Sequence, residues 1–161
     1  MQHLVVRHAE LSDAKTVAEM IEEIERYYGA TSIQPLEERL AQVEAALFDT
    51  PPLAYCLLAI TEGEVVGLAA YSFLWPAAGS THSLFLKELY VRPEGRRSGV
   101  GTRLMQEMQT MAAARLGCSR VEWMTDRDNE GARAFYRSLG FPEFEGKVNY
   151  RAACDLPDQL G

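Results

Sequence analysis

The residues with the clearest chemical potential lie in the segment RRSGVG, from Arg96 to Gly101, where an apolar strand pattern changes into a helical one. The first turn of a helix has unpaired backbone N–H groups and the positive end of the helix dipole. Glycines at 99 and 101 allow the backbone to approach a ligand closely. With the charges of Arg96 and Arg97, these features favour an anion site that is best suited to phosphate.

This turn does not match the commoner phosphate-binding motifs. It contains no G-K-(S/T) of a P-loop, and no G-x-G-x-x-G followed by an acidic residue as in a dinucleotide-binding fold. Taken alone, it is equally compatible with a glycine-rich strand–helix turn whose arginines are solvated. The surrounding elements must therefore support one interpretation or the other.

The elements around the turn alternate in the order β-α-α-β-β-β-α-β-α-β, which predicts an α/β domain around a mixed sheet. Ser12 or Asp13 is expected to cap the first helix, Glu62-Gly63 to form a hairpin turn, and 76–82 to form a loop. The patterns predict strands at 3–9, 53–60, 64–75, 83–91 and 119–125, a last strand or two within 144–156, and helices at about 14–28, 35–47, 99–116 and 128–140.

Composition limits the class of protein. The 161 residues suffice for one domain, 1–161, with a core at about 3–155. No apolar run approaches the ~20 residues of a membrane helix, and the N-terminus lacks the features of a signal peptide. Cys56, Cys118 and Cys154 form no C-x-x-C pair, which argues against a metal or disulfide framework and favours the cytoplasm. The net charge of -7 disfavours nucleic acid as a partner and suits a cationic small molecule.

Two ordered motifs resemble those of the GNAT superfamily of N-acetyltransferases. Arg96-x-x-Gly99-x-Gly101, preceded by LYVRPE, is similar to the family's (Q/R)-x-x-G-x-(G/A) acetyl-CoA motif, and DNEGARAFYRSLGF resembles its N-x-x-A-x-x-(F/L)-Y-x-x-x-G-F segment. The order of elements matches over almost the whole chain. The resemblance implies a GNAT fold: a single domain with a mixed, mostly antiparallel sheet, splayed between the fourth and fifth strands and flanked by about four helices.

The resemblance implies acetyl-CoA as cosubstrate, without a metal. Pantetheine would pair with the backbone of 89–91, where an N–H of Leu89 or Val91 would polarise the thioester carbonyl as an oxyanion hole does. The pyrophosphate would lie on the amides of 97–102, and Asn129 would contact the cofactor from the next helix. The implied cofactor-binding residues are Leu89, Tyr90, Val91, Arg96, Arg97, Ser98, Gly99, Val100, Gly101, Thr102, Asn129, Ala132 and Tyr136.

Two side chains are implied to be catalytic. Tyr136 would protonate the departing thiolate, because a phenol with a pKa of about 10 can stabilise a thiolate whose thiol has a pKa of about 8.5. The alternative is that Phe135 and Tyr136 are both part of the apolar stripe of their helix. Glu88 would take the proton of the attacking amine, or would be a half-exposed ion-pair partner of Lys87.

The position of Glu88 depends on strand alternation, which predicts that Leu84, Leu86, Glu88 and Tyr90 share one face. His82, in the expected loop near the same sheet, is a weaker candidate base. His3 and His8 are expected at the surface.

Segments such as VAEMIEEIERYY and CSRVEW resemble the diamine (spermidine/spermine) and thialysine branch of the family, and the acidic first helix could help to select a cationic amine. Lys87, Arg97 and Asp128 depart from that branch. Alternative acceptors are a protein N-terminus or lysine, an aminoglycoside or an amino acid. A CoA-binding sensor without turnover and a purely structural domain are the rival classes. Relatives in the family are often homodimers, and the exposed last strand could serve as the interface.

Overall fold

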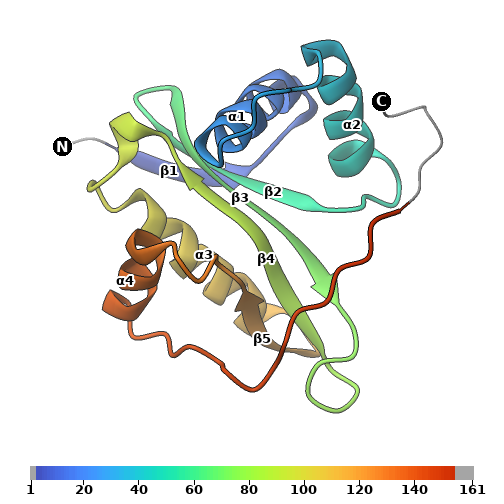
Figure 1. Ribbon diagram of the computed structural model, residues 1–161, viewed down its shortest axis with the longest axis vertical. Coiled ribbons are helices and arrows are strands. Elements are labelled where there is room, and N and C mark those ends of the chain that lie inside the picture. The colour runs from blue at the N-terminus through green and yellow to red at the C-terminus, as the bar shows by residue number, and fades with distance from the viewer. Residues whose placement is uncertain (1–2, 155–161) are drawn as a thin grey trace. The chain divides into compact units, whose positions relative to one another are not determined.

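Five strands form one sheet in the part of the chain that the structure, a computed structural model, describes: residues 3–154. The strands are β1 (Leu4–His8), β2 (Tyr55–Thr61), β3 (Glu64–Leu74), β4 (His82–Val91) and β5 (Cys118–Trp123). They lie in the order β1-β2-β3-β4-β5, with antiparallel pairing except between β4 and β5, which are parallel (Figure 1). The expected mixed, mostly antiparallel sheet is confirmed.

The expected hairpin turn joins β2 to β3. Glu62 and Gly63 have φ angles of 53° and 82°. Two successive residues with positive φ are typical of the turn whose twist matches that of the flanking antiparallel strands.

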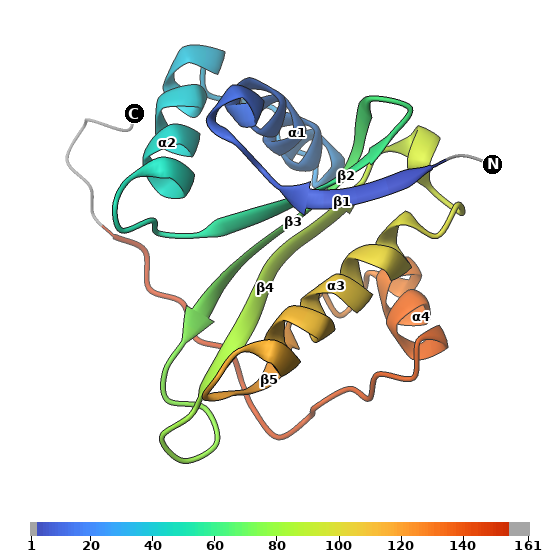
Figure 2. The ribbon, with the colours of Figure 1, turned by 180° about the vertical axis from the view of Figure 1, so that it is seen from behind.

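Three helices pack against this sheet: α1 (Ala14–Tyr27), α2 (Leu36–Phe48) and α3 (Val100–Ala114). Helices α1 and α2 cover one face and α3 the other (Figures 1 and 2). Short 3-10 turns at Leu11–Asp13 and Pro93–Gly95 precede α1 and α3. None of the helices in residues 3–154 is long and apolar enough to cross a membrane.

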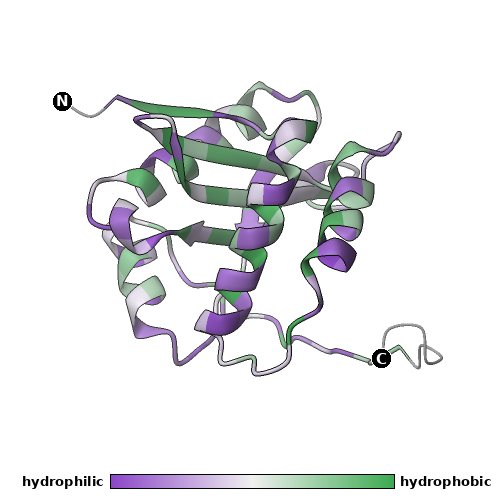
Figure 3. Cartoon of the chain, turned by 90° about the horizontal axis from the view of Figure 1, so that it is seen from above, coloured by the Kyte–Doolittle hydropathy of each residue, from purple (hydrophilic) through white to green (hydrophobic). Residues whose placement is uncertain are grey.

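The core lies between the sheet and these helices. Met20 of α1 and Leu58 of β2 are fully buried on one side, and Leu104 and Met108 of α3 on the other. Figure 3 shows the hydrophobic residues concentrated on the strands, with hydrophilic residues spread over the helices. Burying one such side chain stabilises the fold by about 1.5–3 kcal/mol.

The chain divides into two compact units, Met1–Met124 and Thr125–Gly161. The second contains α4 (Glu130–Ser138). Asn129 caps this helix, since its side-chain oxygen accepts a hydrogen bond from the N–H of Ala132 at 3.1 Å. Gly140, with φ of +84°, ends it as expected.

The prediction of one or two last strands within 144–156 is wrong for the residues that the structure describes, up to Cys154; the remaining two lie outside them. No strand is present from 141 to 154, and Phe144, Val148 and Tyr150 are 80%, 76% and 90% exposed. A strand requires a neighbouring strand for its backbone hydrogen bonds, and this segment pairs with none of the five in the sheet.

Candidate functional site

Strands β4 and β5 separate at a bulge. The last pair of Cα partners between them is Leu86 and Trp123. On the other side of β4, Glu88 is the partner of Ala70 on β3, and Leu86 is the partner of the adjacent residue, Tyr71. Lys87 lies between Leu86 and Glu88 and has no partner position on β3, so it is the extra residue of the bulge. A bulge bends the strand and ends regular pairing. The expected splay between the fourth and fifth strands is confirmed, and it begins at Lys87.

The backbone beyond the bulge has a defined orientation. The N–H of Arg92 donates to the carbonyl of Val66 on β3 at 2.8 Å. Since successive residues of a strand direct their backbone groups to opposite neighbours, the N–H and C=O of Leu89 and Val91 point away from β3, toward the side that β5 has left. In agreement, the carbonyl of Val91 accepts a hydrogen bond from Nε of Arg96 at 3.0 Å rather than from β3.

The same bulge overturns the expected alternation along β4. Glu88 and Tyr90 pair with residues of β3 that face α1 and α2, whereas Leu84 and Leu86 pair with residues that face α3. The extra residue at Lys87 shifts the alternation by one position, so the prediction that these four side chains share a face is wrong. Glu88 is half-buried on the α1/α2 face, and Lys87 is exposed.

The turn from Arg96 to Gly101 has the left-handed backbone that its glycines suggested. Arg97 and Gly99 have φ angles of 61° and 83°. Gly99 is the N-cap of α3, and its carbonyl accepts the N–H of Arg103 at 2.9 Å. The hydroxyl of Ser98 donates to the carbonyl of Gly95 at 2.6 Å and closes the loop. The first three amides of α3, those of Val100, Gly101 and Thr102, have no acceptor within the helix.

Positive charge surrounds these amides. Arg97 is exposed, and the guanidinium of Arg96 lies 5.8 Å from the ring centre of Tyr27 on α1. The first turn of α3 contains no acidic residue. Left-handed backbone, unpaired amides and two arginines make the turn suitable for a phosphate group.

In the second unit, Asn129, Ala132 and Tyr136 are three and four residues apart and therefore lie along one side of α4. The Asn129 side-chain oxygen is engaged as the helix cap. Tyr136 is half-buried, with its ring centre 5.3 Å from that of Phe135.

The three histidines lie away from the bulge or at the surface. His82 is the first residue of β4 rather than part of a loop, six residues and therefore roughly 20 Å along the strand from Glu88. Nε of Arg115 donates to its Nε2 at 3.1 Å. His3 and His8 are exposed, as expected, although Nε2 of His8 lies 2.7 Å from the hydroxyl of Tyr71, whose pKa burial raises to about 12.

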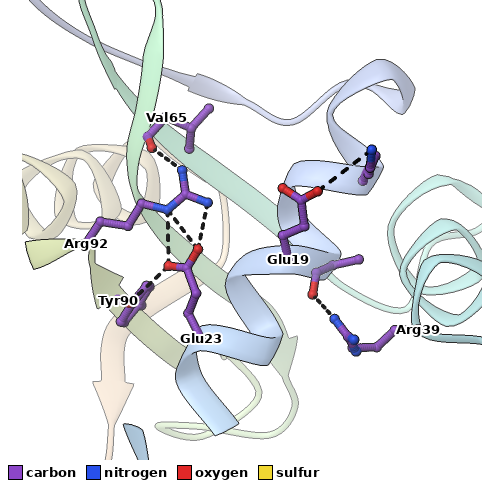
Figure 4. Close-up of polar contacts among 8 residues, drawn as sticks. Glu19, Glu23, Arg39, Val65, Tyr90 and Arg92 are labelled. Carbon is purple, nitrogen blue, oxygen red and sulfur yellow. Dashed lines mark hydrogen bonds and ion pairs between the residues drawn. The ribbon is translucent and has the colours of Figure 1, made fainter. Parts of the chain in front are cut away.

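Sequence reasoning missed the roles of two acidic residues on α1. Glu22 forms ion pairs with Arg39 and Arg26. Glu23 binds Arg92 and Tyr90, as Figure 4 shows. Both carboxylates thus form ion pairs with arginines of the protein itself. These carboxylates are therefore less available to a cationic acceptor. Glu23 and Arg92 are 69 residues apart, so no local pattern marks the pair.

Residues 17–141 match the model of the acetyltransferase (GNAT) family. The chain is 25% identical over 162 residues to a thialysine N-epsilon-acetyltransferase of Sus scrofa, covering 94% of this chain and 93% of that protein. It is 30% identical over 120 residues to an aminoglycoside N(6')-acetyltransferase type 1 of Acinetobacter genomosp. 13, covering 71% and 80%.

Solved structures share the fold. An integron cassette protein from the mobile metagenome of V. cholerae has a TM-score of 0.84 at 23% identity, covering 94% of this chain and 93% of that one. The aminoglycoside N-acetyltransferase AAC(6')-Iy, solved in complex with CoA, has a TM-score of 0.76 at 22% identity, covering 96% and 97%. At these identities the likeness supports the expected fold and no finer property.

Proposed function

Because the chain belongs to the GNAT acetyltransferase family, we propose that it transfers an acetyl group from acetyl-CoA to a primary amine of a small cationic acceptor, such as a diamine, a polyamine or thialysine. The observation that carries the proposal is the separation of β4 from β5 at Lys87. It turns the N–H and C=O of Leu89 and the N–H of Val91 away from β3, beside the proposed phosphate-binding turn on the same chain segment, while the C=O of Val91 accepts from Nε of Arg96.

Each part of the cofactor has a proposed partner. The pyrophosphate binds the amides from Arg97 to Thr102, with Arg96 and Arg97 balancing its charge. The pantetheine arm pairs with the outward-facing backbone of Leu89 and Val91. The backbone of Tyr90 faces β3, so we propose that Tyr90 contributes to the cofactor site through its side chain rather than by backbone pairing with pantetheine. Asn129 and Ala132 contact the cofactor from α4.

The proposed reaction is direct attack in a ternary complex. The amine nitrogen forms a bond to the thioester carbonyl carbon, and the negative charge on the carbonyl oxygen is stabilised by the N–H of Leu89 or Val91. Glu88 takes a proton from the amine, directly or through water. The carbon–sulfur bond breaks, and the departing thiolate takes a proton from the hydroxyl of Tyr136.

Relatives leave a second class of acceptor open. Proteins named aminoglycoside N(6')-acetyltransferase are 30% identical to the chain over most of its length. The exposed Lys87 at the bulge places a positive charge close to the open strand edge, which would repel a diamine and a polycationic aminoglycoside alike, so the relatives and not this charge rank the acceptors. Aminoglycosides are therefore the second candidate, followed by a protein N-terminus or lysine and by amino acids. A non-catalytic CoA sensor remains the rival from another class.

Thiol release from acetyl-CoA across a panel of amines tests the proposal. The panel contains spermidine, spermine, putrescine, thialysine, lysine, aminoglycosides and peptides with free N-termini. Turnover with diamines or thialysine supports the first acceptor class, and turnover only with aminoglycosides or peptides replaces it. Tight CoA binding without turnover on any amine favours the sensor, and absence of CoA binding contradicts the proposal as a whole.

Three further properties belong to this proposal. Residues 17–141, which match the family model, include parts of both units, which favours one acetyltransferase domain. The free cysteines Cys56, Cys118 and Cys154 suit the reducing cytoplasm. We also propose a homodimer in which the last segment of one copy pairs with β5 of the other.

The dimer proposal follows from two unpaired surfaces. Within the described residues, β5 is the last strand of the sheet and pairs on one side only. The last segment has the period-two pattern of a half-buried strand, yet its apolar side chains are exposed. Its apolar or small residues are Phe144, Gly146, Val148, Tyr150 and Ala152, and its polar ones are Glu145, Lys147, Asn149 and Arg151. An unpaired edge and an unpaired amphipathic segment are complementary in a second copy.

A further inference from the structure

The carboxylate of Glu23 joins α1 to the end of β4 (Figure 4). Its Oε2 accepts a hydrogen bond from the hydroxyl of Tyr90 at 3.1 Å. Its two oxygens accept from Arg92, with Nη2 at 2.8 Å and Nε at 3.1 Å. Nη1 of Arg92 donates to the carbonyl of Val65 on β3 at 2.9 Å. One carboxylate thus fixes two side chains that flank Val91.

The arginine side of this cluster is poorly solvated. The side chain of Arg92 is 18% exposed, and its pKa is raised chiefly by the hydrogen bond to Glu23. Burial, with the hydrogen bond to Glu23, also raises the pKa of Tyr90. A bidentate pair between a guanidinium and a carboxylate has a fixed geometry, so it restrains orientation more than a single contact does.

A second contact repeats the connection one turn further along α1. Tyr27, four residues after Glu23, faces the guanidinium of Arg96, four residues after Arg92. Nε of Arg96 donates a hydrogen bond to the carbonyl of Val91. The last turns of α1 therefore contact the chain on both sides of the short turn that leads from β4 to the phosphate-binding amides.

We propose that Glu23 is a positioning residue that aligns the open edge of β4 with the phosphate-binding turn, so that both can hold one acyl-CoA molecule at the same time. This inference rests on the proposed function. Leu89 and Val91 alternate with Tyr90 and Arg92 along the chain. Because Glu23 fixes the side chains of Tyr90 and Arg92, it also fixes the direction of the backbone groups of Leu89 and Val91. Without the carboxylate, Tyr90 and Arg92 would lose their hydrogen bonds to α1, while Tyr27 still faces Arg96 and the turn keeps its own left-handed residues and its Ser98 hydrogen bond.

The neighbouring residue provides a matched control. Glu22 lies on the same helix and also forms an ion pair with a poorly exposed arginine, Arg39, at 3.2 Å. That arginine belongs to α2 and binds the carbonyls of Ala18 and Gln34, none of them in β4 or the turn. Glu22→Gln thus removes a comparable charge pair without changing any contact to β4 or to the turn from Arg96 to Gly101.

Calorimetric binding of CoA and of its nucleotide half, 3′-phosphoadenosine diphosphate, tests the inference in the full-length chain. In Glu23→Gln we expect the affinity for CoA to fall by ~10-fold, with the nucleotide half bound as in the wild type. Glu22→Gln should bind both ligands normally. If the wild type binds no CoA, the proposed function fails rather than this inference.

Two results would overturn the inference. One is an equal loss of affinity for both ligands in Glu23→Gln, because the carboxylate would then support the turn or the whole fold. The other is wild-type affinity for CoA. If Glu23→Gln unfolds, Tyr90→Phe takes its place, since it removes one hydroxyl and keeps the ring in the core. It should weaken CoA alone, by a smaller factor, and no selective weakening would likewise refute the role.

Discussion

Leu86 of β4 lies opposite Trp123 of β5 at the last rung of the ladder between these strands, and the extra residue of the bulge, Lys87, comes directly after it. The end of pairing and the bulge therefore coincide. Beyond this point β5 no longer pairs with β4, so in the described part of the chain the backbone groups of β4 that face away from β3 have no strand beside them. These groups lie directly before the turn that begins α3. The proposed cofactor site is therefore made mainly of backbone, and we propose that side chains orient it.

The left-handed conformation of Gly99 gives the first prediction. Alanine at this position meets no atom within 4 Å, so Gly99→Ala costs only the backbone strain of a positive φ, about 1 kcal/mol of unfolding free energy. Because the strain acts at the start of α3, the affinity for CoA should also fall, by ~10-fold. Chemical denaturation and calorimetry measure the two effects.

Gly63→Ala is the control for this variant. Gly63 has nearly the same φ, +82°, and equally open surroundings, but it lies in the β2–β3 turn. It should lose similar stability and keep its affinity for CoA. If both variants bind CoA equally well, the turn at Gly99 does not hold the cofactor.

The second prediction concerns the departing thiolate. Tyr136→Phe should lower kcat by ~10²-fold, as expected for loss of a general acid, while the affinity for CoA remains close to that of the wild type. Steady-state kinetics with the best acceptor of the panel gives kcat, and calorimetry gives the affinity. An unchanged kcat would leave Tyr136 as a packing residue of α4, which is the alternative that the sequence left open.

The third prediction concerns the attacking amine. If Glu88 takes its proton, Glu88→Gln should be slow at neutral pH and recover as the pH approaches the amine's own pKa of about 10, where the free base no longer needs an acceptor. The exposed Glu94→Gln serves as the charge control and should keep the wild-type pH profile. A uniform loss of rate at every pH in Glu88→Gln would point to a structural role instead.

The elements and the phosphate turn could be predicted because their signals are local. Gly99 and Gly140 mark helix ends by their need for positive φ, and Glu62-Gly63 marks a turn for the same reason. The cap at Asn129 follows from its side-chain chemistry. Such features depend on a few neighbouring residues, so the sequence carries them directly.

The remaining features depend on distant partners. The bulge at Lys87 becomes visible only through the register with β3, and simple alternation therefore placed Leu86 on the wrong face. The link from Glu23 to Arg92 crosses from one element to another and has no local signature. The segment from Phe144 to Cys154 shows the opposite case, since its pattern is that of a strand but it forms no strand within the described residues.

The fourth prediction tests that segment. Tyr150→Asp introduces a charge on the apolar side of the pattern and should convert a dimer into a monomer, as measured by light scattering after gel filtration. Asn149→Asp places the same charge one residue away, on the polar side, and should remain dimeric. A monomeric wild type at micromolar concentration would contradict pairing with a second copy.

The fifth prediction concerns acid stability at the start of α1. Asp13 occupies the N-cap position, as expected, but its carboxylate accepts hydrogen bonds from Arg7 at 2.7 Å and from the N–H of Glu10 at 2.8 Å. The hydrogen bond to Arg7 is the largest cause that lowers the pKa of Asp13 below its usual value. A carboxylate with a lowered pKa in the folded state stabilises the protein above its unfolded pKa, about 3.9, and loses this contribution as the pH falls through the folded value.

Asp13→Asn should therefore lower the unfolding free energy at pH 7 by about 1 kcal/mol, a figure that allows for the solvent screening of the partly exposed Arg7. The difference between variant and wild type should shrink as the pH falls below about 4 and vanish once the carboxyl of the folded protein is protonated. Urea denaturation at a series of pH values measures it. A difference that stays constant down to the lowest pH would mean that shape or packing at Asp13, rather than its charge, stabilises the start of α1.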